Sequence, residues 1–329
     1  MKHLTALFAL TLALLCAVSC ALAEFPVTLT DQTGREVTIA AEPQRIVSGY
    51  YISTSACIAL GLQGRMAAVE AKAGTRNIYA LAAPELAALP SVGTAKAFDM
   101  EACLAAEPDL VILPKRLKDA AAELEGFGVS VLLVNPEDGA LLSEMLLLLG
   151  EATGTAERAQ ALCGFIDGQL ALCEEKLAGA EPVTALVLGV SDRLTCAPGD
   201  MYQSAMLASA GAVNAAGALT GGSWAAVSYE ELLAMNPQAL VIPAEAAYTA
   251  ADVLGDPELS GLEAVKNGAV YAMPTAFEAW DSPVPSGVLG TLWLAQTLHP
   301  ENYGAALYRD AAKALYETYY GFTPDEGAL

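Results

Sequence analysis

Apolar residues recur at every third or fourth position between Thr155 and Ala178. The members of this stripe are Ala159, Leu162, Cys163, Ile166, Leu170, Cys173 and Leu177. Such spacing places them on one face of an α-helix. Gly154 and Thr155 suit the end of one helix and the start of the next, and Gly179 ends the run. The pattern therefore predicts a helix over 155–178, about 36 Å long.

The segments on either side of this helix resemble one another. Residues 98–114 (FDMEACLAAEPDLVILP) and 227–243 (VSYEELLAMNPQALVIP) each begin a short helical pattern with a glutamate and then enter an apolar strand. A leucine follows each glutamate by three residues and a proline by seven. The corresponding pairs are Glu101 and Glu230, Leu104 and Leu233, and Pro108 and Pro237. Residues 126–136 and 266–274 form a second pair, each a glycine turn that feeds a strand ending at a proline. Matched pieces in matched order predict two similar α/β lobes, 24–154 and 179–329, joined by the helix.

The first residues have the layout of a secretory signal. A short basic segment, 1–3, precedes a continuous apolar run over 4–18, which is too short for a typical membrane span. Residues 21–23 (ALA) form a small-x-small cleavage site, whereas residues 17–20 (AVSC) are an imperfect lipobox that would place a lipid on Cys20. We expect 1–23 to be a signal peptide and the protein to be extracytoplasmic, with soluble release favoured over a lipoprotein anchor.

The charge of the chain restricts its partners. Its formal net charge is −22, and removal of 1–23 takes away one lysine and no acid, which leaves 15 basic and 38 acidic residues and a net charge of −23. Nucleic acid and anionic lipid both need a basic surface, so neither is expected as a partner. The five remaining cysteines are odd in number and lack metal-type spacing. We expect mostly buried thiols and at most one disulfide, which the sequence does not assign.

The region after the signal predicts a hairpin from strands 27–30 and 36–39, a short strand over 43–48, and a helix over about 54–60. TDQTGREVTI (30–39) followed by PQRIVS (43–48) resembles the entry sequence of the periplasmic binding proteins of ABC importers for iron-siderophore, haem and vitamin B12. EPDLVI, NPQALVI and WDSPVPSGVLGTLWLAQTLHPE (280–301) resemble later parts of that family. The resemblance implies two Rossmann-like lobes joined by a single long rigid helix, with a ligand cleft between the lobes.

The resemblance implies a role for the paired glutamates. Glu101 and Glu230 match positions at which a family member presents one carboxylate per lobe to arginines of the membrane permease. Two symmetric carboxylates suit a two-fold permease, because complementary charges fix the register of the complex. The alternative is that each glutamate only stabilises the start of a helix.

Candidate ligand-binding residues follow the predicted strands or match the family pattern. They are Tyr50, Tyr51, Trp224, Tyr248, Phe277, Glu278, Trp280 and Asp281. A tyrosine phenolate can ligate ferric iron, although packing on the ligand or hydrogen bonding to it is the more common role. Trp293 is expected in the core, Met201 and Tyr202 in cleft loops, and Lys96 and Lys115 near the rim. The predicted cleft is aromatic and acidic with few arginines, which disfavours strongly anionic chelates.

Absent residues exclude several classes of protein. Once 1–23 are removed, His299 is the one remaining histidine, so neither a histidine-rich zinc or manganese site nor a Ser-His-Asp mechanism is expected. We therefore interpret the chain as a monomeric solute-binding protein, without cofactor, that delivers an iron chelate, haem or corrinoid to an ABC permease. A ligand sensor of the same fold is the alternative, and an enzyme that uses carboxylates such as Glu278 and Asp281 is a more distant one.

Overall fold

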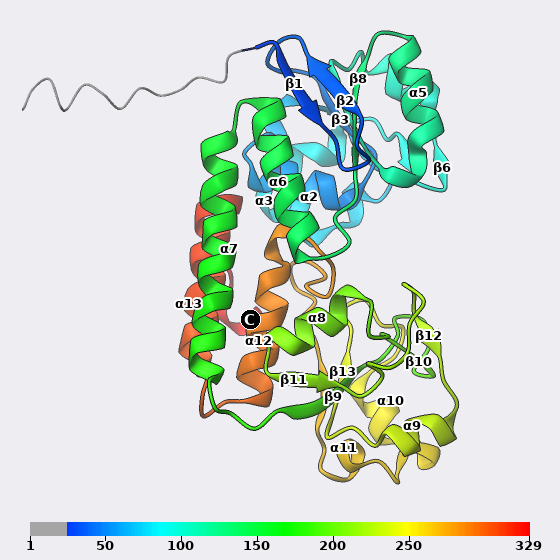
Figure 1. Cartoon of the computed structure of the whole chain (residues 1–329), viewed down its shortest axis with the longest axis vertical. Helices are drawn as coiled ribbons and strands as arrows, with labels where there is room; N and C mark the ends of the chain where they lie inside the picture. The colour runs from blue at the N-terminus through cyan, green and yellow to red at the C-terminus, as the bar shows by residue number, and fades with distance from the viewer. Residues whose placement is uncertain (1–24) are drawn as a thin grey trace, which may run out of the picture.

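The computed structural model describes residues 25–329, so the predicted signal and Cys20 lie outside the described residues. Two α/β lobes lie at the ends of an elongated molecule, and helix α7 (Ala156–Leu177) runs between them (Figure 1). Its bounds agree with the predicted range to within a residue at each end. The buried residues of α7 are six of the seven members of the predicted apolar stripe, since Leu170 packs at its edge. Periodicity alone therefore located this helix.

Each lobe is built on a four-stranded parallel sheet. The N-terminal sheet has the order β4-β3-β7-β8 and the C-terminal sheet the order β11-β9-β13-β14. The strands are β3 (Ile46–Ser48), β4 (Met66–Ala68), β7 (Leu110–Pro114), β8 (Ser130–Val134), β9 (Val183–Val187), β11 (Ala212–Asn214), β13 (Ala239–Ile242) and β14 (Val270–Ala272). Strands β7 and β13 are buried throughout, as expected for parallel strands covered on both faces. The shared strand order confirms two similar α/β units.

Helices cover the sheets, and three short antiparallel strand pairs complete the lobes. The helices of the N-terminal lobe are α2 (Tyr51–Ala59), α3 (Asn77–Ala82), α4 (Met100–Ala105), α5 (Lys118–Gly126) and α6 (Gly139–Thr153). Those of the C-terminal lobe are α8 (Tyr202–Ser209), α9 (Tyr229–Met235), α10 (Ala250–Leu254) and α11 (Glu263–Lys266). The pairs are β1 (Val27–Thr30) with β2 (Glu36–Ile39), β5 (Gly93–Thr94) with β6 (Ala97–Phe98), and β10 (Thr195–Cys196) with β12 (Ala225–Ala226).

The internal repeat extends to the backbone angles. Glu107 and Asn236 occupy corresponding places, after α4 and α9 and directly before a proline, and both have positive φ, 47° and 41°. Positive φ is uncommon outside glycine, and these two are the non-glycine examples among residues 25–329. The following proline disfavours continuation of the helix, so the left-handed residue turns the chain toward the next strand. The sequence echo therefore encodes the same helix-to-strand junction twice.

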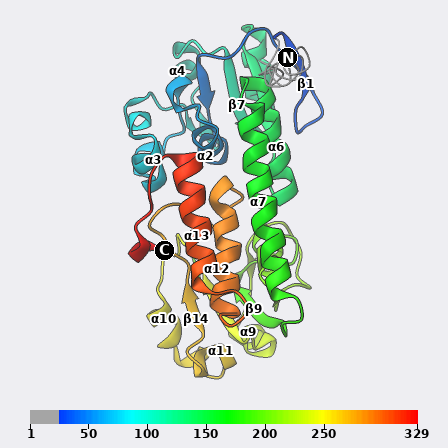
Figure 2. The same cartoon turned by 90° about the vertical axis from the view of Figure 1, so that its left-hand side faces the viewer.

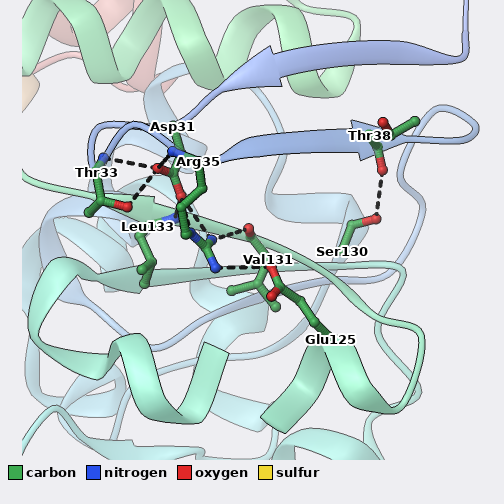
Figure 3. A network of polar contacts seen from close by, with 8 residues as sticks. All are labelled: Asp31, Thr33, Arg35, Thr38, Glu125, Ser130, Val131 and Leu133. Carbon is green, nitrogen blue, oxygen red and sulfur yellow. Dashed lines mark hydrogen bonds and ion pairs between the residues drawn. The ribbon is translucent and has the colours of Figure 1, made fainter. Parts of the chain in front are cut away.

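The N-terminal hairpin is fastened to strand β8 through Asp31 (Figure 3). Its carboxylate accepts hydrogen bonds from the Thr33 hydroxyl at 2.7 Å, the Arg35 Nε at 2.9 Å and the Leu133 backbone amide at 3.1 Å. Arg35 also donates to the Val131 carbonyl and pairs with Glu125. Burial by itself raises the pKa of Asp31, but the hydrogen bonds from Thr33 and Arg35 outweigh it and hold the pKa below its ordinary value. The buried carboxylate thus joins the hairpin turn to β8, and Arg35 extends the network to α5.

We expect Asp31→Asn to lower the free energy of unfolding by about 2–3 kcal/mol at pH 7, because an amide cannot replace an ionised acceptor of several hydrogen bonds. The folded pKa lies below the unfolded one, so the contribution is fully present above the unfolded value, about pH 4, and is lost as the pH falls through the folded pKa. Urea unfolding at pH 7 and pH 3 tests this. Asp310→Asn, at an exposed site on helix α13 (Ala305–Leu315), serves as the control. An unchanged gap between wild type and Asp31→Asn at the two pH values would contradict the assignment.

The C-terminal residues pack on both lobes. Helix α12 (Val288–Leu298) packs against α7, α13 (Ala305–Leu315) packs against α12, and a π-helix, Tyr316–Tyr320, follows α13 to the N-terminal lobe (Figure 2). There Tyr320 Oη lies 3.3 Å from Ser55 Oγ of α2. Arg158 of α7 donates to the carbonyls of Ala59 and Tyr319. The last part of the segment assigned to the C-terminal lobe, 179–329, therefore also contacts the N-terminal lobe.

All five cysteines of the described residues are free and buried. The sequence had left open one disulfide, and none is present between residues 25 and 329. None of the helices in this part of the chain is long and apolar enough to cross a membrane.

Candidate functional site

A cleft separates the two lobes and consists of three adjoining pockets. Their volumes are about 470, 330 and 370 Å³, and Glu245 and Ala279 line all three. The walls come from loops that follow the carboxyl ends of the parallel strands. These loops contribute Tyr50 after β3, Arg116 after β7, Glu137 after β8, Val190 after β9 and Glu245 after β13. Open α/β sheets generally bind ligands at this edge, so the fold places the cleft where a ligand site is expected.

Lysine and arginine gather in the pocket of about 470 Å³, which we call the basic pocket. Four of the 16 lysines and arginines of the chain line it, all from the N-terminal lobe. They are Lys72, Arg76, Lys96 and Arg116. Arg76 is paired with Glu70, whereas the other three form no ion pair with any residue in the range 25–329. In a chain of net charge −22, this concentration marks a place that attracts anions.

Arg76 is held between a buried acid and an aromatic ring. Its Nε lies 3.4 Å from Glu70 Oε1, and its guanidinium carbon lies 4.5 Å from the centre of the Tyr51 ring. Glu70 also accepts hydrogen bonds from Thr54 Oγ1 at 2.7 Å and Tyr79 Oη at 3.0 Å. A buried carboxylate with these partners fixes the arginine over the tyrosine. The charge of Arg76 is therefore positioned before any ligand arrives.

The third pocket, which we call the acidic pocket, has the opposite character. Its titratable acids are Glu137, Asp200, Glu245 and Asp281, and among the described residues no lysine or arginine lines it. Aromatic rings also line it, those of Tyr50, Tyr51, Tyr202 and Trp224. Burial raises the pKa of Asp281 to about 6. The cleft is thus polarised, basic at one end and acidic at the other.

Glu278 lies on the wall shared by the basic pocket and the second pocket. Its Oε2 accepts a hydrogen bond of 2.6 Å from Ser286 Oγ, and the side chain is buried. Burial raises the pKa of Glu278, and hydrogen bonds from Ser286 and Ser55 offset only part of this. The Glu278 carboxyl group therefore lies where the cleft meets the packed C-terminal residues.

Five of the eight predicted ligand-binding residues line the basic or the acidic pocket. They are Tyr50, Tyr51, Trp224, Glu278 and Asp281. Gly49, directly before Tyr50, lets the Leu113 side chain pack closely on the backbone, because a Cβ there would lie 2.7 Å from it. Burial raises the pKa values of both tyrosines, so their phenols are neutral at pH 7. Met201 and Tyr202 also line the acidic pocket, as expected.

Three predicted site residues lie outside the basic and the acidic pocket. Trp280 is fully buried, and its Nε1 donates to Tyr316 Oη at 2.9 Å, so it belongs to the core. Phe277 reaches the edge of the second pocket but is 6% exposed and packs on Trp280 and Tyr316. Tyr248 donates to the Gly189 carbonyl at 2.7 Å and lines none of the three pockets. Trp293, predicted as core, is buried on α12.

The predicted charge of the cleft also needs correction. The sequence indicated an acidic cleft with few arginines, yet one end is lined by two arginines and two lysines. Only Lys96 had been considered among them, and Lys115 instead pairs with the exposed Glu137 at 2.8 Å. Lys72 and Arg76 flank a short 3-10 turn (Ala73–Thr75) after β4, and no periodic pattern in the sequence indicates their position. Arg116 follows β7 directly, and its post-strand position was the one available signal.

Glu101 and Glu230 occupy equivalent exposed positions at the second residue of α4 and α9. The preceding caps, Asp99 and Ser228, each accept a hydrogen bond from a backbone amide of the first turn, which explains why both helices begin there. His299 is buried, with Nε2 3.0 Å from the Gly211 carbonyl. Within residues 25–329, no group of three or more His, Cys, Asp and Glu side chains is arranged to hold a metal ion.

Known proteins are similar to this chain in sequence and architecture. The family described as periplasmic binding protein matches residues 46–276. The molybdate-binding protein MolA of Haemophilus influenzae is 24% identical over 91% of this chain and 93% of its own length. YvrC, an uncharacterised ABC transporter substrate-binding lipoprotein of Bacillus subtilis, is 27% identical over 85% of this chain and 87% of its own. A crystal structure of a periplasmic solute-binding protein from Veillonella parvula has a TM-score of 0.82 and 25% identity, and it covers 92% of this chain and 95% of that one. The chain therefore belongs to the periplasmic binding protein family, and it is an extracytoplasmic solute-binding protein of an ABC transporter and not an enzyme.

Proposed function

We propose that this protein captures a metal chelate, namely an iron-siderophore, haem or a corrinoid, in the cleft and delivers it to the permease. The observation that carries this proposal is the meeting of aromatic rings and unpaired cations in one cleft between the lobes. Tyr51 lies against both the basic and the acidic pocket, and Trp224 faces the acidic one. Flat aromatic rings pack well on the apolar faces of such chelates. The pocket volumes suit a cargo larger than a single ion.

The basic pocket favours some chelates of this class over others. Lys72, Lys96 and Arg116 point to a chelate that carries a carboxylate or another anionic group, because cations without a protein partner gain most from an anionic ligand. Arg76, already fixed by Glu70, would bind such a group in a set direction. This supports anionic chelates, in contrast to the expectation from the sequence.

A free oxyanion is the second candidate cargo. MolA is named for molybdate, and the basic pocket would suit an oxyanion as well as a carboxylate. An oxyanion, however, makes no use of the aromatic acidic pocket. The two candidates therefore differ in whether Trp224 senses the cargo.

A titration distinguishes these cargoes. Purified protein is titrated with haem, cobalamin, ferric citrate, a ferric trihydroxamate, a ferric tricatecholate and sodium molybdate, and tryptophan fluorescence and heat are followed together. We expect one chelate class to bind at micromolar concentration or below and to quench the fluorescence. Trp224 is on the cleft wall, whereas Trp280 and Trp293 are buried, so Trp224→Phe should lose the largest share of the quenching. Heat from molybdate without a fluorescence change would support the oxyanion, and no binding by any chelate would reject the proposed cargo class.

Delivery to the permease is proposed to use Glu101 and Glu230. Both are exposed, each begins a helix at the same place in its lobe, and neither carboxylate is paired with another described residue. They are thus free to pair with arginines of a permease, one for each lobe. Stabilisation of the helix start alone would also favour a glutamate at these positions. A measurement of uptake is therefore needed to distinguish docking from helix stabilisation.

The exported protein either carries a lipid on Cys20 or is released by cleavage after Ala23. The Bacillus relative is named a lipoprotein, which favours a lipid on Cys20 over cleavage after Ala23. The mass of the N-terminal peptide of the exported protein distinguishes the two, since only the first begins with a modified cysteine.

A further inference from the structure

Two buried acceptor atoms of the acidic pocket lack a partner. Asp281 Oδ1 and Gln203 Oε1 form no hydrogen bond with any described residue, and the two side chains are only 4% and 6% exposed. Both residues line the pocket. A buried acceptor without a donor is costly, so native structures usually provide one. The missing partner is therefore expected to be a donor that enters the pocket.

The orientation of Gln203 is fixed by its other amide atom. Gln203 Nε2 donates to the main-chain carbonyl of Asp281 at 2.8 Å. A reversed amide would set two oxygens against each other, so the unpartnered atom is the acceptor oxygen. Both unpartnered atoms are therefore acceptors. They need a hydrogen-bond donor, which an anionic group of the cargo does not supply.

The surroundings add negative charge and an aromatic face. Glu245 is exposed and forms no ion pair among residues 25–329, and Asp200 also lines the pocket. Glu137 is already paired with Lys115, so it contributes less. Trp224 supplies the ring type that attracts cations most strongly. A donor that is also a cation is therefore favoured over a neutral hydroxyl or amide.

We propose that the acidic pocket is a subsite for a primary ammonium group of the cargo. An ammonium has three donors and no acceptor, which matches Asp281 Oδ1, Gln203 Oε1 and the Glu245 carboxylate. The basic pocket repels the same group, so the charges of the cleft fix the direction in which the cargo lies. This inference rests on the proposed function, because it takes the cargo to be a chelate with an anionic part in the basic pocket.

A pair of chelates that differ only at the amine tests the subsite. The probes are the ferric complex of a linear trihydroxamate with a carboxylate at one end and a primary ammonium at the other, and the same complex with that amine acetylated. Calorimetry at pH 7.5 should show the amine form binding about tenfold more tightly or better. Asp281→Asn should remove most of this ratio, and Glu245→Gln, at an exposed site, should reduce it. Lys96→Gln, in the basic pocket, should leave it unchanged. Equal affinity of the two chelates for the wild-type protein would overturn the proposal.

A small amine separates this inference from the choice of chelate. At millimolar concentration, 1,5-diaminopentane should change the Trp224 fluorescence, and its diacetylated derivative should not. The change should be lost in Trp224→Phe and in Asp281→Asn, with the thermal unfolding of both variants measured to show that they fold. If the diamine acts but no chelate binds, the proposed cargo class fails and the subsite stands. If chelates bind without regard to the amine, the subsite fails and the proposed function stands. A diamine without effect would also overturn the subsite.

Discussion

Trp280→Ala is expected to lower the free energy of unfolding by about 3–5 kcal/mol, since removal of a buried tryptophan leaves a cavity that the core does not fill. The indole is fully buried between Phe277, at a centroid distance of 6.4 Å, and Tyr308, at 6.1 Å. Its Nε1 is also the hydrogen-bond donor to Tyr316 Oη. The substitution therefore removes packing and leaves a buried hydroxyl without that donor.

The position of this cluster makes the effect larger than that of an ordinary core residue. Tyr316 begins the π-helix that contacts the N-terminal lobe, and Trp280 precedes α12, which lies along α7. Loss of the indole should therefore loosen contacts between the lobes as well as the C-terminal core. Chemical denaturation followed by far-ultraviolet circular dichroism measures the change.

Trp224→Ala provides the matched comparison, because Trp224 is partly exposed on the cleft wall. We expect this variant to lose less than about 1 kcal/mol of stability while losing affinity for the cargo. If Trp280→Ala were as stable as wild type and instead lost only affinity, the assignment of Trp280 to the core would be wrong.

The contrast between these two tryptophans shows what a local pattern can predict. The Trp224 segment has glycines before it and a capped helix after it, so nearby residues already indicate an exposed loop. Residues 277–281 also follow a strand and contain acids, and their local pattern looks similar. Two of them, Phe277 and Trp280, are covered by Tyr308, Tyr316 and Phe322, which come from the last part of the chain. Local sequence does not reveal what a distant segment will cover.

Elements defined by their own periodicity were predicted well. Helix α7, the hairpin of β1 and β2, and the buried strands β7 and β13 follow from spacing, turn residues and apolar runs that lie within each element. The charge of the cleft could not be obtained in this way. The four cations lie on three separate loops that only the tertiary fold brings together, Lys72 and Arg76 on one, Lys96 on the second and Arg116 on the third. The sequence shows a strongly acidic chain, and the arrangement in space shows where its few cations are concentrated.

Reversal of charge at both Glu101 and Glu230 is expected to abolish uptake while the affinity for cargo stays within about twofold. Both residues are exposed and line none of the three cleft pockets, so the pockets should be unaffected. At a permease surface that presents arginines, each substitution to arginine replaces an attraction by a like-charge contact, which costs several kcal/mol. Two such contacts, one per lobe, should lower uptake by more than a hundredfold.

The measurement is uptake of labelled cargo by cells that carry the protein and its permease, together with calorimetric affinity for the purified variants. Single variants should show intermediate uptake, because each lobe contributes its own contact. Glu157→Arg and Glu174→Arg, exposed on α7, form the matched control pair, and they add the same charge away from α4 and α9. Uptake lost equally in the control pair would attribute the effect to net charge. Normal uptake by Glu101→Arg with Glu230→Arg would leave helix stabilisation as the role of these glutamates, and the docking face would have to be sought elsewhere on the lobes.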